Sequence, residues 1–224
     1  ITHGSNNSIG GANFTESNVI SGNAGPGIVI CCGSNLDNNV VIRNLIGLNV
    51  TGTAAVGNGG GGIPLGGGGV AVNNTRIGGI GETNVISGNS GSGIQLNGPG
   101  VTGTLIRKNM IGVALDLVTD LGNGQNGITV NASDGTIIGG VGFGNLLSGN
   151  TGHGIAVFGG PNTYMDENFI GVADGGAAAV PNDSGGILVT GAGASNFTIG
   201  DVAGNLVSGN GGFAGIAIQD TPAG

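Results

Sequence analysis

The sequence predicts an all-β fold, a parallel β-helix (β-solenoid) of about seven to eight coils. Glycine supplies 55 of the 224 residues, and charged residues make up only 7% of the chain, against a usual share of roughly 25%. Ile, Val and Leu fall in short runs separated by Gly, Asn and Ser, as they do where short strands alternate with turns. Two motifs recur at intervals of about 30 residues, which is typical of stacked coils that bury their inner faces against one another.

The first motif is Gly-Ile-x-apolar, whose isoleucine marks one position in every coil. The first and third side chains after the glycine share one face of a strand, so we expect both columns to point into the core. The glycine suits a corner that requires a positive φ angle or a close backbone approach. The marked isoleucines are Ile1, Ile28, Ile63, Ile94, Ile128, Ile155, Ile187 and Ile216.

The second motif is Asn-x-apolar, and one copy lies between each pair of marked isoleucines. Asparagine tolerates the left-handed region, and a buried amide can donate to one coil while it accepts from the next. We therefore predict an internal asparagine ladder at a second corner; the alternative is a row of asparagines that binds a ligand. The ladder residues are Asn18, Asn44, Asn84, Asn109, Asn145, Asn168 and Asn205.

The residue that follows each ladder asparagine is apolar in every copy. In a plain strand this column faces away from the core, and an apolar stripe of that length is rarely left exposed. Neighbouring loops or another molecule could cover it, or a twisted corner could turn it inward. The column consists of Val19, Leu45, Val85, Met110, Leu146, Phe169 and Leu206.

Short and long coils alternate. The distance from a ladder asparagine to the next marked isoleucine is 10 or 11 residues in one type and 19 in the other. The three long stretches, 46–63, 111–128 and 170–187, are equal in length, and we expect them to form a ridge on one side of the rod. Each carries an asparagine at the same place: Asn58, Asn123 and Asn182.

The motifs NVISGN, GI-x-I, N-x-IG, TGTAAVGN and IGG resemble the right-handed parallel β-helix repeats of the pectate-lyase-like superfamily, in particular those of large secreted and surface proteins of bacteria. The resemblance covers essentially the whole chain. It implies a right-handed helix and an extracellular or cell-surface location. Many such relatives are surface or adhesin-like stalks, whereas others in the superfamily are polysaccharide lyases, hydrolases and epimerases. Similar repeats often carry Thr-Asp after IG, where this chain has Leu48-Asn49, Val113-Ala114 and Val172-Ala173.

Charge and hydropathy exclude two classes of partner. The net charge is −8, and the basic residues are Arg43, Arg76, Arg107 and Lys108, too few for a nucleic-acid footprint. No apolar run approaches the roughly 18 residues of a membrane span. We expect residues 1–224 to form a single β-helix domain. Because Ile1 opens in repeat phase and neither end carries an evident polar cap, we expect that domain to be a segment of a longer chain or the protomer of a filament.

The cysteines of the chain are the neighbours Cys31 and Cys32. Consecutive side chains of a strand point to opposite faces, so we expect one buried thiol and one thiol near the surface. A disulfide between the two neighbours is the alternative.

The acidic residues do not recur at one coil position, and we assign no catalytic residue, metal site or cofactor. The most concentrated charges are Arg107-Lys108, Asp166-Glu167 and Arg43, two coils apart and hence at spacings of about 10 Å. They predict either a functional patch or a solvated edge with weak ion pairs. Four insertion residues could hold Ca²⁺, although no ligand spacing repeats: Asp116, Asp120, Asp174 and Asp183.

Asn-x-Ser/Thr sequons predict possible glycosylation at Asn6, Asn13, Asn49, Asn73, Asn131, Asn182 and Asn196. Uniform repetition and scarce charge favour an extracellular structural or adhesive module without enzymatic activity. It would associate with itself, end to end or laterally, or with cell-surface glycans. The alternative is a β-helix that binds or cleaves a polysaccharide.

Overall fold

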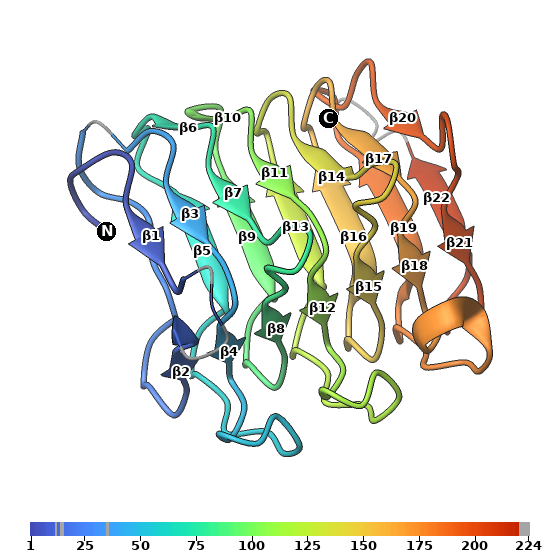
Figure 1. Ribbon diagram of the computed structural model, residues 1–224. Coiled ribbons are helices and arrows are strands. Elements are labelled where there is room, and N and C mark those ends of the chain that lie inside the picture. Colours follow the sequence, from blue (N-terminus) through green and yellow to red (C-terminus); the bar gives the residue numbers. More distant parts are fainter. Residues whose placement is uncertain (12, 14–15, 35, 220–224) are drawn as a thin grey trace.

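The computed structural model describes residues 1–11, 13, 16–34 and 36–219, and these residues form a parallel β-solenoid. Three parallel sheets, here named A, B and C, run the length of the rod, and successive coils contribute one strand to each (Figure 1). Sheets A and B have seven strands each and sheet C has six, so the predicted fold class and coil number are confirmed.

The strands are short, as the sequence predicts. Sheet A contains β1 (Ser8–Ile9), β3 (Val40–Val41), β7 (Arg76–Ile77), β11 (Leu105–Ile106), β14 (Ile137–Gly139), β17 (Tyr164–Asp166) and β20 (Thr198–Ile199). Sheet B contains β2 (Val19–Ile20), β4 (Leu45–Ile46), β8 (Val85–Ile86), β12 (Met110–Ile111), β15 (Leu146–Leu147), β18 (Phe169–Ile170) and β21 (Leu206–Val207). Sheet C contains β5 (Ile63–Gly66), β9 (Ile94–Asn97), β13 (Ile128–Asn131), β16 (His153–Phe158), β19 (Gly185–Thr190) and β22 (Ile216–Gln219).

Two minor elements complete the fold. The strands β6 (Val72–Asn73) and β10 (Val101–Thr102) pair with each other in parallel between sheets C and A. A 3-10 turn, η2 (Asp174–Gly176), lies in the last insertion. Among the described residues, no helix is long and apolar enough to cross a membrane.

The register of sheet C follows the Gly-Ile-x-apolar motif. Ile94 pairs with Ile63 on one side and with Ile128 on the other, and the pairing continues in step to Ile216. The expected phase of Ile1 is wrong. The carbonyl of Ile1 accepts from the Cys31 N–H, which places Ile1 beside Ile30 rather than beside Ile28.

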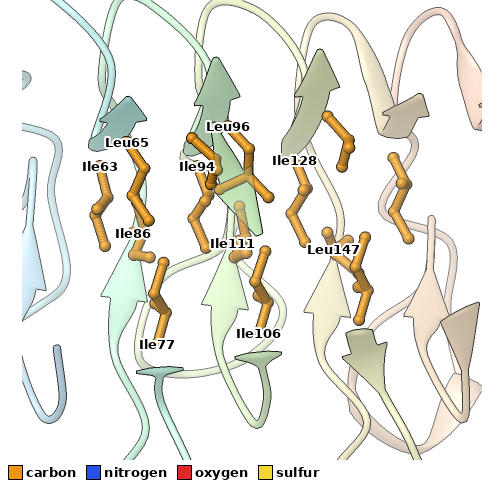
Figure 2. Packing of buried hydrophobic residues seen from close by; sticks show 14 of the residues in the cluster. Ile63, Leu65, Ile77, Ile86, Ile94, Leu96, Ile106, Ile111, Ile128 and Leu147 are labelled. Carbon is orange, nitrogen blue, oxygen red and sulfur yellow. The ribbon is translucent and has the colours of Figure 1, made fainter. Parts of the chain in front are cut away.

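The core is a set of aliphatic columns, two of which come from sheet C. Ile63 and Leu65 of β5 are fully buried, as are their counterparts Ile94 and Leu96 of β9 (Figure 2). The inward side chains of sheets A and B meet them, and each such residue contributes about 1.5–3 kcal/mol by leaving water. The predicted inward orientation of the first and third residues after the motif glycine is therefore confirmed in these strands.

Each coil has one long connection, which lies between sheets A and B in the short coils and between sheets B and C in the long coils. In a short coil the connection from sheet A to sheet B is long, as in residues 78–84, whereas in a long coil residues 42–44 suffice. The long coil makes its detour between sheets B and C. There the predicted insertions form small hairpins, each closed by an antiparallel bridge: Leu48 to Ala55, Val113 to Asp120 and Val172 to Ala179.

The seven predicted ladder asparagines form a continuous chain of amide hydrogen bonds. Asn109 is representative: its Nδ2 donates to Asn145 Oδ1 at 3.1 Å and its Oδ1 accepts from Asn84 Nδ2 at 2.9 Å. The same contact links every neighbour from Asn18 to Asn205. These amides also bind carbonyls of the coils, so they are occupied within the fold.

A second asparagine ladder, not predicted from the sequence, runs along the corner between sheets B and C. It combines the asparagine of each SGN motif with the asparagine of each long insertion. Each Nδ2 again donates to the next Oδ1, at 2.8–3.0 Å. The members are Asn23, Asn58, Asn89, Asn123, Asn150, Asn182 and Asn210.

The favoured interpretation of the cysteines, two separate thiols, is wrong. Cys31 and Cys32 form a disulfide with each other. The interpretation assumed a strand, but the chain has already left sheet C here, and Cys32 has a positive φ of 73°. That conformation brings the two side chains together instead of sending them to opposite faces.

Candidate functional site

The outer face of sheet B is the floor of a groove that runs along the solenoid. Its floor is the predicted apolar column, and its two walls are formed by loops from alternate coils. Loops of the short coils (78–84, 140–145 and 200–205) form one wall, here called the short-coil ridge. The insertion hairpins of the long coils (47–56, 112–121 and 171–180) form the other wall, the insertion ridge, at the lower edge of Figure 1.

Each loop of the short-coil ridge binds to the tight corner of the preceding long coil through one backbone hydrogen bond. The three bonds run from Arg43 N to Glu82 O at 3.3 Å, from Lys108 N to Phe143 O at 3.0 Å and from Glu167 N to Gly204 O at 2.9 Å. All three donors have a positive φ of 53–58°. The donors therefore occupy equivalent positions, each directly before a ladder asparagine.

The insertion ridge covers part of the apolar column. Leu146 of the floor is 8% exposed, and it clusters with Val113 and Val180 of the insertions. Phe169, half-buried, packs against the same cluster. Neighbouring loops, one of the alternatives that the sequence left open, therefore cover the apolar column. They cover it only in part, because Val19 and Leu206 remain 45% and 41% exposed.

Three hollows follow one another along the groove. The first, of about 340 Å³, is lined by Arg43, Leu45, Val85, Met110 and Leu115 among others. The second, of about 150 Å³, lies between Lys108, Met110, Leu117, Phe169 and Asp174. The third, of about 310 Å³, is lined by Glu167, Phe169 and Leu206.

Charge is distributed unevenly along this groove. Arg43 and Lys108 line its first and second hollows, whereas Asp174 and Glu167 line the second and third. Arg43, Lys108 and Glu167 stand at equivalent corners two coils apart, and hence at spacings of about 10 Å. In a chain with four basic residues, two of the four lie in this groove.

The predicted patch of Arg107, Lys108, Asp166 and Glu167 does not form as an ion-pair cluster. The Arg107 guanidinium stacks over the ring of Phe143, 4.6 Å from its centroid. Glu167 Oε2 accepts from the Phe143 N–H at 3.2 Å. Within the described part of the chain, the observed salt bridge joins Arg76 to Glu82, both in one short coil.

Asp166 is a structural carboxylate. It is fully buried and accepts from the backbone N–H groups of Asp201, Ala203 and Gly204 at 2.8–3.3 Å. Burial by itself raises the pKa of Asp166, but these hydrogen bonds and one from the Tyr164 hydroxyl outweigh it, so the pKa lies below its usual value. Burial and the neighbouring Asp166 raise the pKa of Tyr164.

The four aspartates considered for Ca²⁺ do not converge. The Asp116 carboxylate accepts from Thr119 and from the Val118 N–H within its own turn, and these bonds lower the pKa of Asp116. Asp120 Oδ1 accepts from the Gly122 N–H. Asp174 and Asp183 lie in a different insertion. Over residues 1–219, so far as they are described, no group of three or more His, Cys, Asp or Glu side chains is arranged to hold a metal.

The sequons differ in accessibility. Asn182 cannot be glycosylated in the folded chain, which corrects that prediction, because it is fully buried and its amide binds Asn210 and Leu147 within the second ladder. The side chains of three others are hydrogen-bonded on the surface: Asn49, Asn73 and Asn131. The exposed asparagines, whose glycosylation stays a prediction, are Asn6, Asn13 and Asn196.

No family model and no curated protein matches this sequence. Among solved structures, the fold is similar to the A-module of a mannuronan C-5 epimerase from Azotobacter vinelandii, with a TM-score of 0.47 and 16% sequence identity. The similarity covers 92% of this chain and 56% of that module, so the chain spans about half of the module's length. At that identity and TM-score the similarity carries no argument about activity.

Proposed function

We propose that the chain is an extracellular polysaccharide-binding β-solenoid whose ligand lies along the sheet B groove. The observation that carries this proposal is the row of hollows over the apolar column of sheet B, the first two of which are lined by Arg43 and Lys108 at equivalent corners. A pyranose ring has apolar C–H faces and a polar rim. Its face packs on an aliphatic floor, and its rim meets the polar walls.

The positions of the two cations favour an acidic polysaccharide. Arg43 and Lys108 are separated by two coils, about 10 Å along the groove. That interval is comparable to the length of a disaccharide unit, so both cations can reach carboxylates on the same side of one uronic acid chain. Charge-assisted bonds from guanidinium and ammonium groups to carboxylates are stronger than those between neutral groups.

Affinity measurements with soluble polyuronates test this proposal. Polygalacturonate and polymannuronate should bind more tightly than a neutral glucan of similar length, and added salt should weaken their binding. Lys108→Gln should weaken polyuronate binding about five- to tenfold, the loss of one charge-assisted contact.

Arg76→Gln is the matched control, because it removes the same charge from a side chain that pairs with Glu82 and does not line the hollows. It should leave the affinity unchanged. Equal binding of acidic and neutral polysaccharides, or equal losses in the two variants, would contradict the proposal.

A second candidate function is a structural or adhesive stalk. Two unbroken amide ladders favour it, because they join successive coils from Asn18 to Asn210 and stiffen the rod. A stalk should resist bending, which small-angle X-ray scattering can measure as a persistent rod-like form in solution. A strongly flexible chain in solution would exclude this role.

A further inference from the structure

The tips of the short-coil ridge carry aliphatic side chains that point into solvent. Ile80, Val141 and Val202 are 67%, 55% and 72% exposed. Each is the third residue after the last core residue of its sheet A strand, so the three occupy one repeated position. These aliphatic side chains therefore form a row of three exposed tips along the rod, one on each loop of the short-coil ridge.

The three tips are held at a constant spacing. Their loops bind to Arg43, Lys108 and Glu167 by the three backbone hydrogen bonds described above, and these donors are equivalent. Consecutive tips are thus two coils apart, about 10 Å along the axis. A partner that contacts all three must present apolar groups with the same period, and a second copy of this chain does so.

Charge complementarity selects the direction of pairing. Near the first tip, an Arg43 Nη lies 3.6 Å from the place that a Cβ would take on Gly81, the neighbour of Ile80. Beside the last tip lies Asp201, an exposed residue adjacent to Val202, whose side chain is hydrogen-bonded to Tyr164 of the same chain. Antiparallel copies bring Arg43 of one close to Asp201 of the other at both ends, whereas parallel copies bring like charges together.

We propose that two copies of this chain associate laterally and antiparallel through the tips of the short-coil ridge, with a two-fold axis at Val141. Val141 then packs against Val141 of the partner, and Ile80 packs against Val202 of the partner. The interface is isologous and closes as a dimer. Three side chains and two charge pairs form a small interface, so the dimer is reversible and its population depends on concentration.

Cross-linking of single-cysteine variants by a bismaleimide shorter than about 10 Å, the spacing of two coils, tests the arrangement. This reagent forms thioethers and leaves the Cys31–Cys32 disulfide intact. Val141→Cys should cross-link with itself. Ile80→Cys alone should not, because its copies lie about four coils apart, but a mixture of Ile80→Cys and Val202→Cys should give a dimer.

Sedimentation equilibrium without polysaccharide supplies an independent measurement. The wild-type chain should show a monomer–dimer equilibrium, and Val141→Asp should weaken it at least about tenfold by placing two carboxylates on the axis. Val118→Asp, on the insertion ridge at 54% exposure, is the matched control and should dimerise like the wild type.

A strictly monomeric wild type at about 1 mM would overturn the proposal, as would self-cross-linking of Ile80→Cys, which indicates parallel pairing. Because these experiments contain no polysaccharide, their failure leaves the binding role of the groove untouched.

Discussion

The residues at the corners of the solenoid are the same in successive coils, whereas those on the outer face of sheet B vary from coil to coil. At the two asparagine ladders, every described coil repeats the same residue with the same bond, whatever the length of its loops. On the outer face of sheet B, floor residues differ in size from Val85 to Phe169, and the loops beside them change sides from coil to coil. Positions that repeat without change therefore hold the stack together. Positions that vary within a repeated frame shape the groove.

The largest effect should come from the centre of a ladder. Asn109→Ala removes an amide that is 1% exposed and bonded to two asparagines and to the Ile77 carbonyl. Leaving these partners unsatisfied in the interior should lower the free energy of unfolding by roughly 3–5 kcal/mol, measured by denaturant titration. Asn18→Ala, at an exposed position of the same ladder, should cost about 1 kcal/mol or less. Equal losses would mean that burial does not determine the importance of a ladder bond.

Two glycines with nearly the same φ angle allow the cost of a steric clash to be distinguished from the cost of a positive φ angle. Gly112 and Gly98 have φ angles of 95° and 97°. A Cβ on Gly112 would lie 2.2 Å from the Ser148 carbonyl oxygen, whereas a Cβ on Gly98 would meet nothing within 4 Å. Gly98→Ala should therefore cost about 1 kcal/mol for conformation alone, and Gly112→Ala about 3 kcal/mol or more. Similar midpoints of thermal unfolding would show that close stacking at this corner is unimportant.

Substitution of Asp166 tests whether the stability of one coil depends on a buried charge that the other coils lack. Asp166→Asn should destabilise the chain by about 2 kcal/mol, since the buried carboxylate accepts three backbone N–H groups. Because its pKa in the folded chain is lowered from 3.8, the carboxylate stabilises fully above that value, and its contribution is lost as the pH falls through the lowered pKa. The difference between wild type and variant should hence shrink below about pH 4. A difference that does not change with pH would assign the loss to shape rather than charge.

The smallest effect concerns the short-coil ridge. Phe143→Leu removes the ring over which Arg107 stacks and should cost about 0.5–1 kcal/mol. Phe213→Leu, at a ring that is 85% exposed, is the control and should change nothing measurable. If Phe143→Leu instead costs as much as a ladder residue, the short-coil ridge also holds the stack together, although its residues vary from coil to coil.

Sheets B and C could be predicted from sequence because their strands follow invariant residues, a ladder asparagine or a motif glycine. Sheet A could not be recognised as a column, since Arg76, Leu105 and Tyr164 begin its strands and share no property. The second ladder had a signal, the asparagine of the repeated SGN. It was missed because its partners lie in insertions of different sequence, and their alignment is visible only once the hairpins are closed.

The groove was predictable only in part. The apolar column was evident in the sequence, but its walls come from loops that are far apart along the chain and alternate between coils. Local sequence did not reveal that Asp166 turns inward while its neighbour Glu167 lines a hollow, because a positive φ at Glu167 decides it. The cysteine prediction failed for the same reason, a backbone angle that strand periodicity does not anticipate.

The alternation of loops has a consequence for how such a protein can grow. Adjacent coils cannot exchange places, because one puts its long connection before sheet B and the other puts it after. The smallest unit that can be duplicated or deleted without disturbing the walls is therefore a pair of coils, about 60 residues. Adding one pair should lengthen the rod by about 10 Å and extend the same surface by one period. Removing a single coil would bring two loops of the same ridge into collision.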